Sequence, residues 1–315
     1  MQVAPAATAF RDALQRRSPV VLDGGLATQL EAQGHNLGTA LWSAGLLRSE
    51  PRAIALAHRA FLESGAECII SASYQASRRG FMSLGLSAAE ADRLIASAVE
   101  IAIAARDAFL SEHRDSEVAP LVAASVGPYG AVLHDGSEYR GDYGIGREAL
   151  RAFHEPRLRL LDDCGADVLA CETIPDREEA EVLGGLLETV KTPAWISFSC
   201  RDERSISDGN PIADVATRFR GHPTVLAVGI NCTAPRFVTP LIRELRRAVP
   251  DKAVVVYPNS GERYDGRNHS WHGTVTPLDC AAAAQEWRAA GATLIGGCCR
   301  MGPDHIAAMR DALGK

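Results

Sequence analysis

Three cysteines have the residue type and the position for a metal site. Cys232 ends the apolar run VLAVGINC, and the adjacent pair Cys298 and Cys299 ends the run TLIGGCC. Thiolates are ligands that zinc favours, and three of them leave the fourth tetrahedral position open for a substrate or for water. Gly296 and Gly297 precede the pair and would permit a turn that lets both sulfurs reach one ion. These residues alone leave open the alternative that all three are buried core thiols.

Two acidic residues stand at similar positions. Asp23 follows the first apolar run and precedes Gly24 and Gly25, and Glu172 lies at the end of the run DVLACET. Two carboxylates beside exposed backbone amides would complement an α-amino acid, with its ammonium between the acids and its carboxylate on the amides. The residues themselves leave two alternatives open. Asp23 would otherwise cap a helix, and Glu172 would otherwise form a salt bridge.

The other cysteines and the histidines are expected to be structural. Free cysteine is a common core residue, and Cys171, although it precedes Glu172, alternates with it and is expected to point into a different layer. The histidines are expected at the surface or at helix ends, because none has the helical spacing of a metal motif. The residues concerned are Cys68, Cys164, Cys171, Cys200, Cys280, His58, His134, His305, and the pair His269 and His272 in a polar loop.

The elements that must position these residues alternate regularly along the chain. Eight apolar runs are continuous rather than alternating, which is typical of parallel strands buried on both faces. They are Val20–Gly25, Glu67–Ser73, Leu121–Gly127, Asp167–Thr173, Ala194–Cys200, Val225–Cys232, Ala253–Asn259 and Thr293–Cys299. Amphipathic segments between them predict helices at Pro51–Glu63, Ala88–Leu110, Arg147–Asp163, Asp176–Leu187, Pro235–Arg247 and Pro277–Ala289. Prolines at 51, 235, 277 and 303 mark expected helix starts.

A repeated junction indicates one architecture over residues 1–315. The segments SGAECIIS, CGADVLAC and AGATLIGG each place Gly-Ala between a helix end and an apolar run, where glycine suits a left-handed residue. Eight β/α units in 315 residues predict a single (β/α)₈ barrel. A doubly wound sheet is the alternative, but no G-x-G-x-x-G follows the first run. In a barrel the strand ends share one mouth, and strands six and eight flank strand seven, which brings Cys232 near the pair.

Composition favours a small-molecule ligand. The chain is 46% hydrophobic and 23% charged, so it can bury a large core. Its net charge is −6 and it has no Lys/Arg stripe, which argues against a nucleic-acid or membrane partner. The charged N-terminal segment MQVAPAATAFRDALQRR does not resemble a signal peptide, and we therefore expect a cytoplasmic protein. The oligomeric state is not predicted.

Together the run ends resemble the homocysteine S-methyltransferases, from about Val20 to His305. The segments that carry the resemblance are LDGGLATQLE, LWSA, SASYQAS, SVGPYGA, CETIPDREEA, GINC, VYPNSGE and GGCCR. GINC and GGCCR at this separation are highly specific for that family. The resemblance implies a (β/α)₈ barrel and one zinc ion on Cys232, Cys298 and Cys299. It also implies that Asp23 and Glu172 hold the amino group of homocysteine.

Further substrate-binding residues are expected at the same mouth. Ser71 and Asn231 lie at strand ends, and the Gly24 and Gly25 amides would receive the substrate carboxylate. Trp42 and Tyr74 are expected to surround the cation of the methyl donor. No catalytic side chain is expected beyond the thiol that zinc activates.

The expected reaction is methyl transfer from a sulfonium to homocysteine, which yields methionine. Thr173 stands where the betaine-using branch is expected to place a tyrosine, and the chain offers no room for cobalamin or folate modules. S-methylmethionine is therefore the first choice of donor and S-adenosylmethionine the second. The alternatives are a betaine-using enzyme, a zinc hydrolase and a non-catalytic thiolate-zinc protein. A hydrolase fits least well because an all-thiolate site lacks the usual His or carboxylate ligands.

Overall fold

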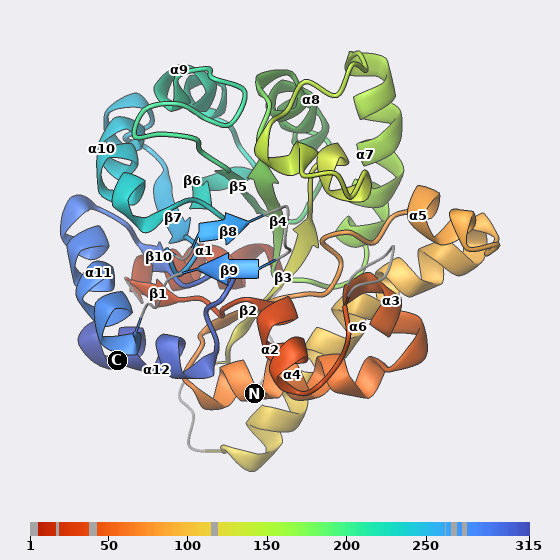
Figure 1. The fold of residues 1–315 in the computed structure, drawn as a ribbon, viewed down its shortest axis with the longest axis horizontal. Helices are drawn as coiled ribbons and strands as arrows, with labels where there is room; N and C mark the ends of the chain where they lie inside the picture. The colour runs from red at the N-terminus through yellow and green to blue at the C-terminus, as the bar shows by residue number, and fades with distance from the viewer. Residues whose placement is uncertain are drawn as a thin grey trace.

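Eight parallel strands form the centre of the molecule (Figure 1). The computed structural model describes residues 6–16, 19–37, 43–114, 119–261, 263–265, 270–272 and 276–315. Within them the sheet runs in the order β1-β10-β7-β6-β5-β4-β3-β2. The strands are β1 (Val20–Val21), β2 (Cys68–Ile70), β3 (Leu121–Val126), β4 (Val168–Ile174), β5 (Ala194–Phe198), β6 (Val225–Asn231), β7 (Ala253–Tyr257) and β10 (Leu294–Ile295).

The two ends of this sheet meet and close it into a barrel. A parallel bridge joins Leu22, just after β1, to Cys68 on β2. Beside it, the Asp23 N–H donates to the Cys68 carbonyl at 3.0 Å, and the Glu67 N–H donates to the Val21 carbonyl at 2.7 Å. All eight predicted strands are present, so the predicted (β/α)₈ barrel is confirmed and the open sheet is excluded.

Helices surround the barrel and carry the chain from each strand to the next (Figure 1). They are α1 (Ala6–Arg16), α2 (Leu26–Ala32), α3 (Ser43–Ser49), α4 (Pro51–Glu63), α5 (Arg78–Ser83), α6 (Ala88–Glu112), α7 (Arg147–Asp162), α8 (Arg177–Leu187), α9 (Ile212–Ala216), α10 (Val238–Ala248), α11 (Pro277–Ala290) and α12 (Pro303–Ala312). Short 3₁₀ turns lie at η1 (Tyr129–Val132), η2 (Ser137–Tyr139), η3 (Thr217–Phe219) and η4 (Pro235–Phe237). The predicted helices are all observed, except that Pro235 begins a 3₁₀ turn that leads into α10.

Two apolar layers hold the fold together. One fills the barrel interior, where Phe10 of α1 packs against Trp195 of β5 with ring centroids 5.9 Å apart. The other lies between the strands and the helices. Cys68 belongs to the interior layer and Cys171 to the outer one, which confirms that Cys171 points away from the layer that holds Glu172. Helix α1 thus contributes to the interior layer through Phe10. The site lies at the C-terminal ends of the strands.

The Gly-Ala junctions have the predicted conformation. Gly65, Gly165 and Gly291 end α4, α7 and α11, with φ angles of 93°, 80° and 114°. These angles lie in the left-handed region, where glycine carries no steric penalty. The repeat in the sequence is therefore a repeat of one helix-to-strand turn.

Two histidine predictions were wrong. His58 on α4 is not at the surface: it is fully buried, and neither of its ring nitrogens has a hydrogen-bond partner among the described residues. Burial lowers the pKa of His58 to about 4. His272, predicted with His269 in a polar loop, lies on β9 (Ser270–His272), which pairs antiparallel with β8 (Arg263–Asp265). His269 lies outside the described residues. His305 caps its own helix, since the Gly302 N–H bonds to its Nδ1 at 3.3 Å, as expected.

Among the described residues, no helix combines the length and the apolar character needed to span a lipid bilayer.

Candidate active site

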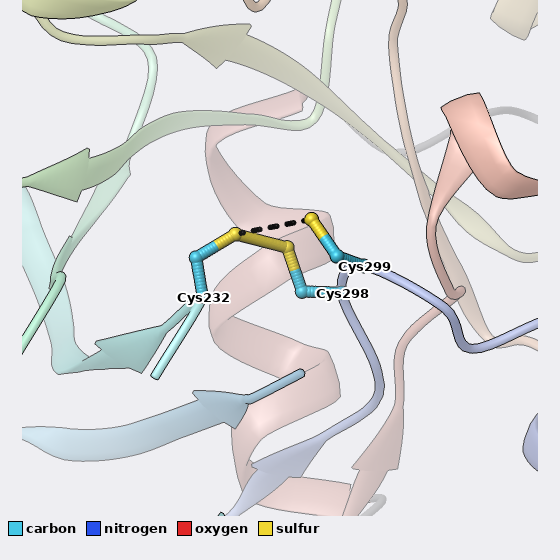
Figure 2. Close-up of side chains that lie close together, drawn as sticks. All are labelled: Cys232, Cys298 and Cys299. Atoms are coloured by element: carbon cyan, nitrogen blue, oxygen red, sulfur yellow. Dashed lines mark hydrogen bonds between the residues drawn. A yellow bond between two sulfur atoms is a disulfide. The ribbon is translucent and has the colours of Figure 1, made fainter. Parts of the chain in front are cut away.

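Cys232, Cys298 and Cys299 converge at the mouth of the barrel, as their placement after strands six and eight predicts (Figure 2). Their sulfur atoms all lie within 4.8 Å of one another. Strand β7 pairs with both β6 and β10, and the chain that leaves it holds the cysteines in place. The Cys232 N–H donates to the Tyr257 carbonyl at 3.3 Å, and the Cys298 N–H donates to the Pro258 carbonyl at 2.8 Å.

A disulfide joins Cys232 to Cys298, with the two Cα atoms 5.7 Å apart (Figure 2). Cys299 is free, and its Sγ lies 4.0 Å from the Sγ of Cys232. This pairing was not predicted from the sequence. A disulfide and a metal ion are alternative uses of the same sulfurs, because a metal requires thiolates. These sulfurs can therefore form the disulfide or hold a metal ion, but not both at once.

Gly296 and Gly297, which precede the cysteine pair, do not form the predicted turn but allow close packing. Neither Gly296 nor Gly297 has a positive φ, and the left-handed residue of this turn is Arg300, with φ 67°. A Cβ on Gly296 would lie 2.6 Å from the Cβ of Leu22, and one on Gly297 would lie 2.7 Å from the Cβ of Met301. Glycine is required at 296 because the chain comes close to Leu22, just after the first strand, and at 297 because the Met301 side chain packs there.

Backbone strain is concentrated at the same mouth. Thr173 and Cys232 have φ angles of 61° and 47°, which are unfavourable for side chains with a Cβ and most of all for β-branched threonine. Asn231 supports Thr173: its Oδ1 accepts from the Thr173 N–H at 2.7 Å, and its Nδ2 donates to Oγ1 at 2.6 Å. Its Oδ1 also accepts from Ser197 at 2.8 Å. The Asn231 amide thus positions the strand ends.

Asp23 is buried at the mouth, with 1% of its surface exposed. One carboxylate oxygen accepts a hydrogen bond from the Ile70 N–H at 2.7 Å, and the other has no partner among the described residues. Burial and the nearby charge of Glu172 raise the pKa of Asp23 well above its usual range, although the Ile70 bond opposes this. Asp23 is not a helix cap, because the N-cap of α2 is Gly25.

Glu172 lies on the same side of the barrel mouth. Its carboxylate accepts a hydrogen bond from the Ser125 hydroxyl and another from Tyr257. Burial raises its pKa to about 7 against the effect of these bonds. Among the described residues it has no salt-bridge partner. Two buried acids whose charges repel would both be stabilised in their ionised form by one ammonium group between them.

Several other predicted substrate contacts are already occupied within the chain. The Gly25 N–H donates to the Met301 carbonyl at 2.9 Å, so it is not an exposed amide. The Ser71 hydroxyl lies 2.8 Å from the Ser73 hydroxyl and accepts from the Ser125 N–H at 3.1 Å, which ties neighbouring strands together. Gly24 stays a prediction. Trp42 lies outside the described residues.

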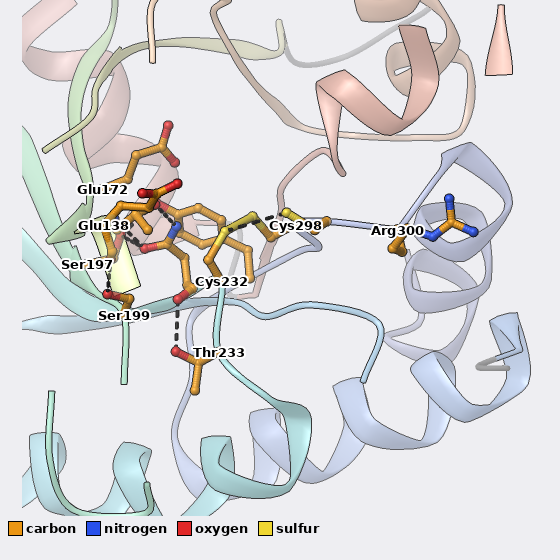
Figure 3. The surroundings of a disulfide bond; sticks show 12 residues. Glu138, Glu172, Ser197, Ser199, Cys232, Thr233, Cys298 and Arg300 are labelled. Atoms are coloured by element: carbon orange, nitrogen blue, oxygen red, sulfur yellow. Dashed lines mark hydrogen bonds between the residues drawn. A yellow bond between two sulfur atoms is a disulfide. The ribbon is translucent and has the colours of Figure 1, made fainter. Parts of the chain in front are cut away.

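Two residues of the mouth, Glu138 and Tyr139, were not predicted from the sequence. Glu138 and Tyr139 lie on η2, within the long connection from β3 to α7, and Glu138 lies near the disulfide (Figure 3). Tyr139 hydrogen-bonds to Cys299, although burial dominates and raises the pKa of that thiol to about 11. Tyr74, which was predicted, also belongs here, since Glu138 and Glu172 both contribute to raising the pKa of its hydroxyl after burial. The only signal for Glu138 and Tyr139 was an acid and a tyrosine in a polar loop after a strand.

Comparison with known proteins identifies this arrangement. A family profile described as Homocysteine S-methyltransferase matches residues 20–313. Homocysteine S-methyltransferase YbgG of Bacillus subtilis (strain 168) is 49% identical over 290 residues, covering 91% of this chain and 92% of that protein. The homocysteine S-methyltransferase of Escherichia coli (strain K12) is 47% identical over 305 residues, with coverages of 96% and 97%. The chain belongs to the homocysteine S-methyltransferase family.

As a member of the homocysteine S-methyltransferase family, the chain is a methyltransferase that acts on homocysteine. Its fold matches crystal structures of the homocysteine methyltransferase MmuM from E. coli. The metallated form superposes with a TM-score of 0.86 at 44% identity, and the comparison covers 96% of this chain and 99% of that one. The oxidized form superposes with a TM-score of 0.87 at the same identity and coverage.

Proposed function

We propose that this enzyme carries one zinc ion on Cys232, Cys298 and Cys299 and transfers a methyl group from a sulfonium donor to homocysteine. The observation that carries the proposal is the convergence of three sulfur atoms within 4.8 Å at the barrel mouth. The described residues add no fourth His, Cys, Asp or Glu to this group. Three protein ligands with one open position are the pattern of a catalytic rather than a structural zinc site.

The donor set fits zinc. Soft thiolate sulfurs favour zinc over hard cations such as magnesium or calcium, which prefer oxygen ligands. When bound, zinc would hold the homocysteine sulfur as a thiolate near neutral pH, where the free thiol is mostly protonated. The E. coli enzyme MmuM, at 44% identity, has a crystal structure in a metallated form, which supports a metal role in a relative of this chain.

The two buried acids would hold homocysteine by its amino group. The unpartnered Asp23 oxygen requires a donor, and the ammonium of an amino acid supplies one. Glu172, whose charge acts on that of Asp23, would accept from the same ammonium. The two carboxylates would hold homocysteine at its amino end and direct its thiol towards the cysteines.

The transfer itself needs no general acid. The homocysteine thiolate attacks the methyl carbon of the donor and forms a new carbon–sulfur bond. The bond between that methyl and the donor sulfur breaks, and its electron pair stays on the donor sulfur. The positive sulfonium and the negative thiolate become two neutral thioethers, so no proton must be supplied to the leaving group. The role of the chain is to hold the two sulfurs in line on either side of the methyl.

S-methylmethionine is the proposed donor, with S-adenosylmethionine as the second choice. Thr173 at φ 61° occupies the position where the family resemblance would place the tyrosine of a betaine cage. A short sulfonium amino acid also needs no nucleoside pocket.

A parallel donor assay tests the proposal. The zinc-loaded enzyme would receive homocysteine with equimolar S-methylmethionine, S-adenosylmethionine or betaine, and methionine would be measured. We expect the highest kcat/KM with S-methylmethionine. A preference for S-adenosylmethionine would change the donor and keep the reaction. A preference for betaine would contradict the sulfonium assignment, and activity undiminished in metal-free enzyme would contradict the zinc assignment.

A further inference from the structure

Two carboxylate oxygens at the mouth are buried without a hydrogen-bond partner. Within the described residues, the buried carboxylate oxygens in this state are Asp23 Oδ1 and Glu138 Oε2. A buried anion is unfavourable unless a cation or donor pairs with it. Homocysteine has one ammonium, which the proposed function assigns to Asp23 and Glu172. Glu138 therefore has no counterpart in homocysteine.

Glu138 is held in position by its backbone. The Ser199 hydroxyl, just after β5, donates to the Glu138 carbonyl at 2.9 Å. The connection that carries Glu138 is also anchored by Glu179 of α8, which is fully buried. Glu179 accepts from the Tyr129 N–H at 2.6 Å and from the Tyr143 hydroxyl at 2.7 Å, on either side of η2. The segment that carries Glu138 is therefore fixed to the barrel by hydrogen bonds.

The side chain of Glu138 lies near the reacting end of the site. Figure 3 shows it among the residues around the disulfide, with Arg300 on the opposite side of the cysteines. The next residue, Tyr139, hydrogen-bonds to Cys299, which places this part of η2 beside the cysteines.

Among the described residues Glu138 has no salt-bridge partner, and the nearby Arg140 pairs with another acid. Arg140 is paired with Asp135 at 3.3 Å, and 64% of its side chain is exposed. An acid flanked by two tyrosines beside Cys299 has the charge and the aromatic surface that suit a cation.

We propose that Glu138 is the specificity-determining residue that recognises the positively charged sulfur of the methyl donor. The inference rests on the proposed function, because it requires a sulfonium donor. The ligand class is a small sulfonium amino acid whose positive sulfur lies beside the Glu138 carboxylate, with Tyr74 and Tyr139 around it. Asp23 and Glu172 bind the methyl acceptor, homocysteine, and Glu138 binds the methyl donor.

The chemistry predicts how this residue affects kinetics. The positive charge on the donor sulfur disappears as the methyl leaves, so attraction to Glu138 is strongest before the reaction and weaker in the transition state. Such an interaction lowers the KM for the donor without raising kcat. Loss of the carboxylate should therefore raise the donor KM and leave kcat unchanged or higher.

The test compares Glu138→Gln with Asp142→Asn in zinc-loaded enzyme. Asp142 lies in the same connection, its side chain is exposed, and its φ of 49° suits asparagine, so the control removes one negative charge away from the site. We expect Glu138→Gln to raise the KM for S-methylmethionine about tenfold or more, with the KM for homocysteine within about twofold of wild type. Asp142→Asn should match wild type in both.

A neutral analogue separates the charged sulfur from the rest of the donor. Homoleucine has the shape of S-methylmethionine with a CH group in place of the positive sulfur. As a competitive inhibitor against S-methylmethionine, it should keep its inhibition constant in Glu138→Gln within about twofold. An equal loss of affinity for both compounds would overturn the inference, since Glu138 would then bind the donor ammonium. So would an unchanged donor KM, or an effect on homocysteine alone. If wild type used no sulfonium at all, the proposed function would fail instead.

Discussion

The Sγ of Cys299 lies 4.0 Å from the Sγ of Cys232, while Cys232 is bonded to Cys298. Three sulfurs of one cluster are therefore divided between a disulfide and a free thiol. Because metal binding requires thiolates, reduction of this disulfide must precede metal binding. The disulfide and a bound metal ion would therefore exclude each other.

Reduced protein is expected to bind about one zinc per chain, and protein oxidised by diamide to bind none until a thiol reductant is added. Cys298→Ser should abolish both zinc binding and turnover and leave the barrel folded, because the cluster lies at the mouth and not in the core. Metal analysis, activity and circular dichroism measure the three effects. Cys164→Ser is the matched control, since Cys164 bonds to the Leu160 carbonyl and serine can replace that bond. Full activity in Cys298→Ser would contradict the site.

Asp23→Asn and Glu172→Gln are expected to raise the KM for homocysteine, because each removes a charged partner of its ammonium. Loss of one such buried partner costs about 2–5 kcal/mol. Steady-state kinetics with homocysteine and with a thiol that lacks the amino group would check this. The simpler thiol should be a poor substrate for wild type and lose little more in the variants. Equal losses for both thiols would mean that the acids are structural.

Homocysteine binding should weaken as the pH falls through 7. Burial raises the pKa of Glu172 to about 7, and the ammonium binds the ionised carboxylate. Below that pH a proton must leave before homocysteine binds, so the KM should rise by up to about tenfold per pH unit for one such group. Glu172→Gln should flatten this part of the profile. A profile identical to that of wild type would show that other groups control it.

Stability should fall as the pH drops from about 6.5 to 4, in part because of His58. Its pKa is lowered to about 4 in the folded chain by burial, from an ordinary value near 6.5. Between these values the unfolded chain binds the proton and the folded chain does not, so unfolding is favoured by up to about 3 kcal/mol. His58→Leu should reduce this acid sensitivity in urea unfolding at several pH values. His113→Gln, at an exposed helix end, should not change it.

The sequence by itself determined the barrel and the convergence of its cysteines. Continuous apolar runs require strands covered on both faces, and the Gly-Ala turns at Gly65, Gly165 and Gly291 repeat the same junction. Once the order of parallel strands is known, their ends must share one mouth, and Cys232 must lie near Cys298 and Cys299. The placement of Asp23 and Glu172 follows from the same rule. The periodicity of α4 also carried an unused signal, since His58 lies one helical repeat from the buried Ile54 and Leu62.

Only the tertiary structure decided which polar atoms are satisfied. Gly25 and Ser71 have the right residue types for a ligand, but Met301 and Ser125 already bond to them. Glu138 reaches the site through a loop whose path depends on the distant Glu179, and no local pattern encodes such a contact. Whether a polar group is free to bind a ligand depends on partners far away along the chain. A sequence pattern places a residue at the mouth. The packed structure determines whether its polar atoms already have hydrogen-bond partners or are left to bind a ligand.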